Sequence, residues 1–69
     1  METLRITLAA ARVNAGLTQE EVAKSIKVSK NTLVSWEKGY SEPTISQGRE
    51  LSNLYKIPLD NIFLPMKSN

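Results

Sequence analysis

Residues 17–39, LTQEEVAKSIKVSKNTLVSWEKG, decide the fold because they encode two short helices in close succession. The first helix follows Thr18, which has the pattern of a capping box with the glutamate three residues later. Apolar residues at helical spacing predict that this helix ends near Lys27. Ser29 is placed to cap the second helix, which is expected over residues 30 to about 38. Helices joined by so short a turn cannot lie antiparallel, so we expect them to cross at a steep angle.

The sequence on either side of these two helices predicts further helical segments. Residues 4–15 have the composition and apolar spacing of a helix, which Thr3 is placed to cap. Another helix is expected to begin after Thr44 or Ser46, either of which can cap it, and to end near Lys56. The residues of this helix expected to face the core are Ile45, Leu51, Leu54 and Tyr55.

Residues 59–63 lie between two prolines and are expected to form one last helical turn. No segment alternates polar and apolar residues in the way that a strand does. The expected fold class is therefore all-α, a compact bundle of five short helices in a single domain over residues 1–69. Within it the two-helix motif spans about residues 18–38, and residues 64–69 form a short C-terminal tail.

Composition narrows the possible functions. The 69 residues include no cysteine and no histidine, with nine lysine and arginine against seven aspartate and glutamate. A chain of this size buries only roughly 60% of its unfolded surface, and its stability is expected not to exceed ~3–5 kcal/mol. Without cysteine or histidine, disulfides, thiolate nucleophiles and the usual zinc sites are excluded, so we expect no enzyme, metal site or cofactor. The net charge of +2 favours anionic partners only weakly.

We expect that the N-terminal stretch is not a targeting segment. Arg5 and Arg12 interrupt its most apolar part. The longest uncharged run there, residues 6–11, is too short for the core of a signal peptide or for a membrane span. The protein is therefore expected to be cytoplasmic, in a bacterial cell or a phage-infected host, with no membrane partner.

Residues 17–39 resemble the helix-turn-helix of the phage-repressor and Cro-like family, also called the Xre family. This motif requires a small residue where the second helix crosses the first, and Ala23 occupies that position. It also requires apolar residues on both helices and in the turn. The residues that match this structural core are Val22, Ala23, Ile26, Val28, Leu33 and Trp36. Arg12 and Glu37 match positions that commonly form a partly buried ion pair in family members.

The resemblance extends beyond the motif and includes two departures. Residues 43–63, PTISQGRELSNLYKIPLDNIF, are similar to the family's fourth and fifth helices, so the resemblance covers roughly residues 4–63. Lys27 stands where the family usually has glycine, and it is expected to adopt a positive φ at some cost in energy. Gly48 stands where the family usually has a larger residue, and close helix packing is the one reason that the sequence suggests.

The resemblance implies sequence-specific binding to double-stranded DNA, with the helix over residues 30–38 in the major groove. Side chains on its solvent face would then read base edges, since lysine suits guanine, asparagine suits adenine, and valine can contact a thymine methyl group. The residues implied in base reading are Ser29, Lys30, Asn31, Val34 and Ser35. Those implied in holding phosphates are Gln19, Thr32, Lys38, Tyr40 and Ser41, with Lys24 and Lys27 as outer contacts.

Several of these residues also have a purely structural interpretation. An exposed lysine such as Lys30 is often only solvated, and Asn31 suits the capped start of a helix. Thr32 and Ser35 can simply solvate the helix surface, and Tyr40 can pack on its own loop. The motif favours DNA contact for Lys30 and Asn31, and both interpretations stay open for the other three.

The family further implies a transcriptional regulator, expected to be a Cro-like repressor of phage or bacterial origin with no small-molecule substrate. Family members bind near-palindromic operators as dimers with half-sites ~10 base pairs apart, so a homodimer is expected at least on DNA. Leu59, Leu64 and Met66 have no evident place in the core and are the candidates for the dimer surface. A tail folded back onto the bundle is the alternative for them. No sensor or oligomerisation domain is expected after residue 69.

A second apolar surface motivates an alternative function. On the helix expected over residues 4–15, Ile6, Ala10 and Val13 fall on the side opposite its buried face. A helix that is apolar on two faces implies either a protein partner or merely scattered exposed residues. The alternative is therefore a small antirepressor or antitoxin-type regulator that acts by binding a partner repressor. Sequence-specific retardation of DNA in a gel would favour DNA binding over this alternative.

Overall fold

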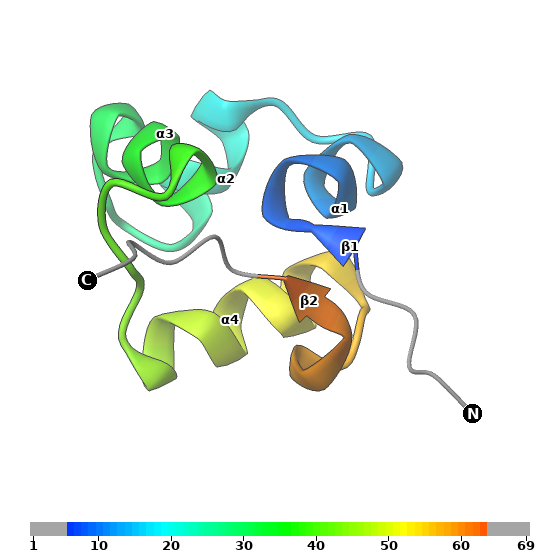
Figure 1. Cartoon of the computed structure of the whole chain (residues 1–69). Coiled ribbons are helices and arrows are strands. Elements are labelled where there is room, and N and C mark those ends of the chain that lie inside the picture. The colour runs from blue at the N-terminus through cyan, green and yellow to red at the C-terminus, as the bar shows by residue number, and fades with distance from the viewer. Residues whose placement is uncertain (1–5, 64–69) are drawn as a thin grey trace.

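The computed structural model describes residues 6–63, which form four α-helices, one 3-10 turn and a small parallel sheet (Figure 1). In chain order the elements are β1 (Ile6–Thr7), α1 (Leu8–Asn14), α2 (Gln19–Ser25), α3 (Lys30–Lys38), α4 (Ile45–Tyr55), η1 (Leu59–Asn61) and β2 (Ile62–Phe63). Helices α2 and α3 lie together, and α1 lies beside the two strands. Helix α4 runs below the other three helices in the view of Figure 1. The fold is mostly helical, as expected from the sequence.

The expectation of five helices without a strand is wrong at the two ends of the domain. The last segment forms the 3-10 turn η1, closed by a 2.9 Å hydrogen bond from the Asn61 N–H to the Pro58 carbonyl, and then strand β2. Strand β2 pairs in parallel with β1, so that Ile6 lies opposite Ile62. Strands of two residues are too short to show an alternating pattern, which is why the sequence did not indicate them.

Helix α1 begins at Leu8, four residues later than expected. Thr7 caps it from an extended conformation, with φ of −69° and ψ of 158°, and its Oγ1 accepts a 3.1 Å hydrogen bond from the Ala10 N–H. Because the cap is at Thr7, residues 6 and 7 are extended and pair with β2. Thr3, the expected cap, lies outside the described residues.

The hydrophobic core lies where all four helices and β2 meet. Its buried residues are Leu8, Ala11, Val22, Ala23, Ile26, Leu33, Trp36, Leu51, Tyr55 and Ile62. None of the fully buried residues among residues 6–62 is charged, so this core is stabilised by apolar packing. No helix within the described residues is long and apolar enough to cross a membrane.

Helix α4 differs from expectation at its first residue, and Gly48 lies on its buried face. Ile45 was expected to face the core, but it is 73% exposed. At 3.6 residues per turn, Ile45 lies about a quarter of a turn away from the face that buries Leu51 and Tyr55. Gly48 lies on the buried face, where a Cβ would come within 3.4 Å of Leu59 Cδ1. The close packing of α4 against η1 therefore occurs at this glycine.

Two lysines adopt the left-handed backbone conformation. Lys27, in the turn between α2 and α3, has φ of 61°, as expected from its place in a turn that usually contains glycine. Lys56 ends α4 with φ of 58°, which the sequence did not indicate. A residue with a Cβ is less stable than glycine in this region, so both turns store some strain.

Candidate nucleic-acid interface

The interface is built on α2 and α3, whose first turns are both closed by side chains. Thr18 Oγ1 accepts a hydrogen bond from the Glu21 N–H at 3.1 Å, and Glu21 Oε1 accepts one from the Thr18 N–H at 2.8 Å. Ser29 Oγ accepts a 3.1 Å hydrogen bond from the Thr32 N–H at the start of α3. These caps fix where each helix begins, and therefore which residues of α3 reach its exposed face.

Helix α3 buries one face and exposes the other. Leu33 and Trp36 are buried in the core, while Lys30 and Asn31 are exposed at the first turn. Val34 and Ser35 are half-buried, and Lys38 is exposed in the last turn. Asn31 makes no side-chain hydrogen bond within the described residues, so its amide is available to an external partner. The exposed row of α3 therefore combines a cation, an amide and an apolar side chain, which are groups that can contact base edges.

Residues 40 and 41, in the loop after α3, each make a hydrogen bond to Ser35. The Tyr40 N–H donates to the Ser35 carbonyl at 2.9 Å, and the hydroxyls of Ser35 and Ser41 lie 2.8 Å apart. Tyr40 itself is 67% exposed. Sequence reasoning assigned Ser35 and Ser41 separate roles and missed their contact. The two serines are six residues apart with Gly39 between them, and such a spacing does not predict a hydrogen bond.

A network of polar side chains ties α1, α2 and α3 together behind this surface. Arg12 Nε donates to Glu37 Oε2 at 2.8 Å, and one guanidinium nitrogen of Arg12 also donates to the Leu17 carbonyl at 3.0 Å. Gln19 Nε2 donates to Glu37 Oε1 at 3.0 Å. The side chains of Arg12 and Glu37 are only 15% and 6% exposed. The amide of Gln19, a candidate for phosphate contact, is thus directed to Glu37 in this structure.

Tyr55 lies close enough to this network to be affected by its charges. Burial, helped by the negative charge of Glu37 and opposed by the positive charge of Arg12, raises the pKa of the Tyr55 hydroxyl from 10.0 to about 12. Its hydroxyl oxygen is buried without a hydrogen-bond partner among the described residues. Sequence reasoning placed Tyr55 in the core but did not connect it with the ion pair.

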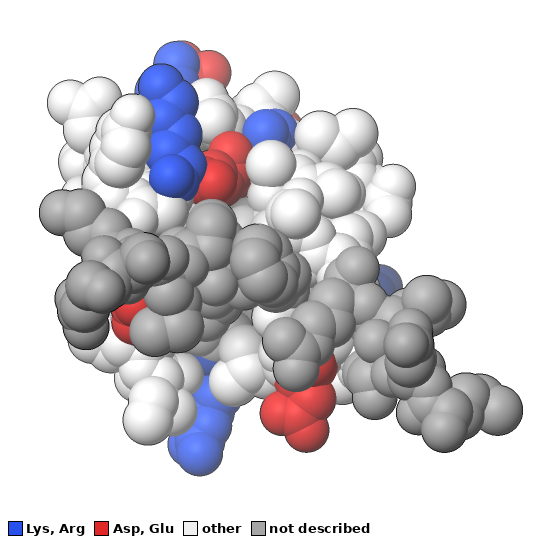
Figure 2. Space-filling model, viewed as in Figure 1, with Lys and Arg blue, Asp and Glu red and all other residues white. Residues whose placement is uncertain are grey.

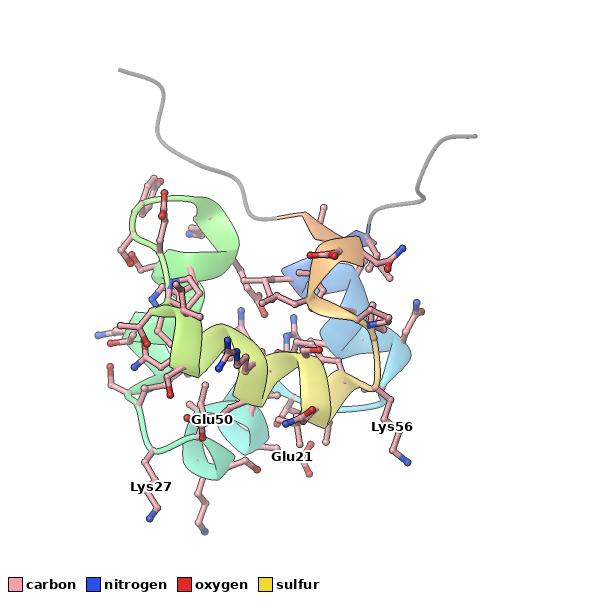
Figure 3. The ribbon with its side chains drawn as sticks, turned by 90° about the horizontal axis from the view of Figure 1, so that it is seen from below. Glu21, Lys27, Glu50 and Lys56 are labelled. Atoms are coloured by element: carbon pink, nitrogen blue, oxygen red, sulfur yellow. The ribbon has the colours of Figure 1, made fainter. Side chains whose placement is uncertain are left out.

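Charged side chains of both signs are mixed on the face of the molecule that Figure 2 draws. Figure 2 shows blue and red side chains interspersed over the described part of the face that it draws, rather than one basic patch. Lys27 extends outward from the turn between α2 and α3, and Lys56 extends outward from the end of α4 (Figure 3). Among the described residues, no three acidic side chains gather in a way that could hold a metal ion. Local contacts, rather than a strong overall field, therefore distinguish the exposed face of α3.

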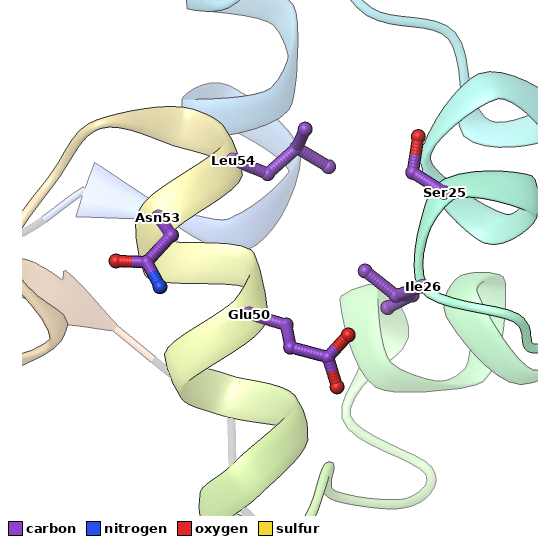
Figure 4. Close-up of a pocket in the computed structure, with 5 residues that line it drawn as sticks. All are labelled: Ser25, Ile26, Glu50, Asn53 and Leu54. Carbon is purple, nitrogen blue, oxygen red and sulfur yellow. The ribbon is translucent and has the colours of Figure 1, made fainter.

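An open groove of about 310 Å³ lies between the end of α2 and helix α4. Its lining residues are Ser25, Ile26, Glu50, Asn53 and Leu54 (Figure 4). None of them is on α3, so the groove is separate from the helix expected to read DNA.

Comparison with known proteins identifies the arrangement of α2 and α3. A sequence model of a family described as helix-turn-helix matches residues 8–62, which include all four helices. The chain belongs to the phage-repressor and Cro-like family of helix-turn-helix proteins. No solved structure matches the chain significantly.

Three curated relatives support the same family. RstR, a transcriptional repressor of the cryptic phage CTXphi from Vibrio cholerae, is 36% identical over 58 residues, which cover 84% of this chain and 52% of RstR. The uncharacterized HTH-type transcriptional regulator MJ0272 of Methanocaldococcus jannaschii is 31% identical over 48 residues, covering 70% of this chain and 73% of MJ0272. An uncharacterized HTH-type transcriptional regulator of Archaeoglobus fulgidus is 28% identical over 61 residues, covering 88% and 87%. The chain spans about half the length of RstR.

The positions that form the helix-turn-helix core are packed in this structure. Val22, Ala23, Ile26, Leu33 and Trp36 are buried, and Val28 in the turn is half-buried against them. The remaining phosphate candidates of the motif lie at its surface, with Lys24 and Lys27 exposed and Thr32 half-buried beside Ser29. The core residues of the helix-turn-helix are thus packed inside, and the residues predicted to face DNA lie on its surface.

The apolar residues considered for a dimer or partner surface are spread over the fold. Leu59 packs on Gly48, and Ile6 lies in β1 and packs against the core, so neither forms an open apolar surface. Val13 on α1 is 63% exposed. Leu64 and Met66 lie outside the described residues. The second apolar face expected on the first helix is therefore wrong, because Ile6 precedes α1 and only Val13 stays prominently exposed.

Proposed function

We propose that this helix-turn-helix protein binds double-stranded DNA sequence-specifically and regulates transcription as a repressor, with α3 in the major groove. The observation that carries the proposal is the two-sided character of α3. Its inner face is buried through Leu33 and Trp36, whereas Lys30 and Asn31 are exposed at its first turn. In proteins with this motif, the N-terminal residues of the second helix contact base edges. The relationship to RstR, named a transcriptional repressor, supports the direction of regulation.

The proposed contacts divide into base reading and positioning. Lys30 and Asn31 are assigned to base edges, with guanine and adenine as the matching bases, and Ser29, Val34 and Ser35 extend the same surface. Lys38, Tyr40 and Ser41 follow one another past the end of α3 and are assigned to phosphates. Thr32 and Gln19 are assigned to phosphates near the helix starts. Because the Gln19 amide is bound to Glu37, backbone N–H groups of the first turn of α2 are the more direct donors there.

We further propose that two copies bind one near-palindromic operator. A single module buries only ~600–1,000 Å² on DNA, so pairing two modules supplies affinity that one lacks. Among the described apolar candidates, Val13 is the one exposed enough to contribute to a dimer surface. We propose that the protein acts in the cytoplasm by binding rather than by catalysis.

The alternative of a regulator that acts by binding a partner repressor has weaker support. Its motivation was an apolar second face on the first helix, but Ile6 lies in β1 and packs against the core. Val13 alone does not make a contiguous apolar patch of the kind that marks an interaction site. The exposed polar row on α3 is the more specific feature, and it favours DNA.

A binding-site selection on the purified protein tests the proposed function. Random duplexes are bound at physiological salt, recovered by gel retardation and sequenced over several rounds. We expect enrichment of a near-palindrome with half-sites ~10 base pairs apart. Binding to the enriched site should weaken as salt rises, because phosphate contacts release counterions. Equal binding of all duplexes, or no binding, would overturn the proposal.

A further inference from the structure

Glu20 on α2 lies beside the base-reading end of α3. Its Oε2 atom is 3.8 Å from Nζ of Lys30. Glu20 is the second residue of α2 and Lys30 is the first residue of α3, so the contact joins the exposed starts of the two helices. The side chains of Lys30 and Glu20 are 52% and 73% exposed. Glu20 lies in the first turn of α2, where the helix dipole favours a negative charge whether or not Lys30 is near. The ion pair itself is so exposed that it adds little to folding, so stability does not require the pairing with Lys30.

The other two acidic side chains of the motif have structural partners. Glu21 completes the capping box of α2. Glu37 is nearly buried and receives hydrogen bonds from Arg12 and Gln19. Glu20 has no ion pair or hydrogen bond through its side chain within the described residues apart from the contact with Lys30. Its negative charge therefore faces solvent where the proposed function places DNA.

A carboxylate at this position opposes binding to any phosphate backbone. It repels the phosphates directly, and it neutralises the Lys30 ammonium that would otherwise attract them. In the major groove, however, guanine N7 and O6 accept hydrogen bonds from a lysine at shorter range than 3.8 Å. Phosphate oxygens accept equally short hydrogen bonds, but their attraction for the protein depends on net charge, which Glu20 cancels, whereas contact with guanine depends on the direction of the donor. Glu20 therefore weakens the attraction to phosphates more than it weakens a directed contact of Lys30 with a matching base.

We propose that Glu20 is a specificity-determining residue, which restrains Lys30 from non-specific phosphate contacts and releases it to a matching base. This inference rests on the proposed function. Glu20 lowers affinity for all DNA but lowers it most for DNA that lacks the operator. The protein thus gains discrimination at the expense of total affinity.

The test compares Glu20→Gln with the wild-type chain on the selected operator and on a random duplex of equal length. Fluorescence anisotropy gives Kd between 50 and 200 mM salt. Glu20→Gln removes one negative charge that repels phosphates, which is equivalent to gaining one phosphate contact. The plot of log affinity for random DNA against log salt concentration should therefore become steeper by about 0.9. We expect affinity for random DNA to rise about threefold to fivefold at the lower salt concentrations, whereas affinity for the operator changes less than twofold.

Two further variants show whether the effect passes through Lys30. Glu50→Gln makes the same change in net charge on α4, where Glu50 lines the groove opposite the end of α2, and it should leave the ratio of operator to random affinity unchanged (Figure 4). In a Lys30→Ala background, Glu20→Gln should no longer alter that ratio. Circular dichroism of each variant checks that the helices are intact before binding is compared.

The outcomes separate this inference from the proposed function. Equal gains on both duplexes, or no gain on either, would overturn the role of Glu20 in specificity while leaving sequence-specific binding intact. Loss of preference at one base pair in Glu20→Gln alone would also overturn it, since Glu20 would then read a base such as cytosine itself. If the wild-type protein binds both duplexes alike, the proposed function fails first and the inference fails with it.

Discussion

Arg12 and Glu37, 25 residues apart in the sequence, are joined by a 2.8 Å hydrogen bond from Nε to Oε2 that ties α1 to α3. The contact sets the position of α3 at its C-terminal end, while Leu33 and Trp36 fix its buried face. Gln19 donates to the same carboxylate at 3.0 Å, so α2 joins the network as well. The position of α3 relative to α1 and α2 therefore depends on this cluster of Arg12, Gln19 and Glu37 as well as on the apolar core.

Arg12→Ala should destabilise the fold strongly. It leaves the Glu37 carboxylate, 6% exposed, without its cation, and breaking a buried pair in this way costs about 3–5 kcal/mol. That loss is comparable with the whole stability of about 3–5 kcal/mol expected for a domain of this size. Thermal melting followed by circular dichroism should show a largely unfolded variant at 37 °C. Lys30→Ala removes one partner of an exposed pair and serves as the control, with a melting temperature close to wild type.

Lys27→Gly should stabilise the protein by about 0.5–1 kcal/mol. Lys27 has φ of 61°, where glycine lacks the steric cost of a Cβ, and this gain outweighs the greater flexibility of glycine in the unfolded chain. A gain of 1 kcal/mol corresponds to about 4–8 °C in melting temperature. The matched control is Lys24→Gly inside α2, which should destabilise by about 1 kcal/mol. A lower melting temperature for Lys27→Gly would show that its side chain has a stabilising contact in solution.

Tyr55→Phe should leave stability at neutral pH unchanged or raise it by about 1 kcal/mol, because it removes a buried hydroxyl that has no partner among residues 6–63. The two proteins should differ more in alkali. The pKa of Tyr55 is raised from 10.0 to about 12 in the folded state, mainly by burial, so folding favours the protonated form. That contribution is fully present below pH 10 and is lost as the pH rises through 12.

Urea unfolding at pH 8, 10 and 11.5 measures this difference. Lysine titration affects both proteins equally, so the comparison isolates the Tyr55 hydroxyl. Wild type should lose stability faster than Tyr55→Phe above pH 10. Parallel curves for the two proteins would mean that the hydroxyl ionises as readily in the folded state as in the unfolded chain.

The sequence predicted the centre of this fold better than its ends. Thr18 and Ser29 are residue types that cap helices, so they predicted where two helices begin, and the structure has both caps. Ile6 was assigned to the first helix because it lies between Leu4 and Leu8, whose spacing suits a helix. The pairing of β1 with β2, in contrast, joins residues from opposite ends of the domain. Such a contact has no signal in a single local window.

The candidate site shows the same division between local and distant information. The residues that α3 exposes could be predicted from the spacing of its apolar residues, since an α-helix has 3.6 residues per turn. The contacts of Ser35 with Ser41 and of Lys30 with Glu20 depend on how side chains meet across a turn. The crossing of α2 and α3 and the exposed conformation of the loop decide these contacts, and neither is encoded by spacing alone.

The two kinds of proposed DNA contact should separate experimentally. Lys30→Ala or Asn31→Ala should weaken operator binding by about 1–3 kcal/mol and relax preference at one base position. Lys38→Ala should weaken binding to all sequences by a similar factor and lower the salt slope by about 1. Lys38 is a cleaner probe than Gln19, whose amide also supports Glu37. A repeated selection with each variant provides the measurement, and an unchanged motif for both Lys30→Ala and Asn31→Ala would remove α3 from base reading.

Replacing two glycines by alanine should change stability in opposite directions. Gly48 is helical, and its new Cβ would meet Leu59 Cδ1 at 3.4 Å, the short end of ordinary contact. Gly48→Ala should therefore stabilise α4 by about 0.5–1 kcal/mol through the better helix propensity of alanine. Gly16 has open space around it but φ of 74°, so Gly16→Ala should destabilise by about 1 kcal/mol through backbone strain alone.

The pair separates helix propensity from backbone strain because the chemical change is the same at both positions. Thermal and urea unfolding of the two variants should place wild type between them. If Gly48→Ala is also less stable than wild type, then the contact of the new methyl group with Leu59 Cδ1 is unfavourable despite its ordinary distance of 3.4 Å. Gly48 would then be required by the approach of Leu59, and the packing of η1 on α4 would be tighter than the contact distance implies.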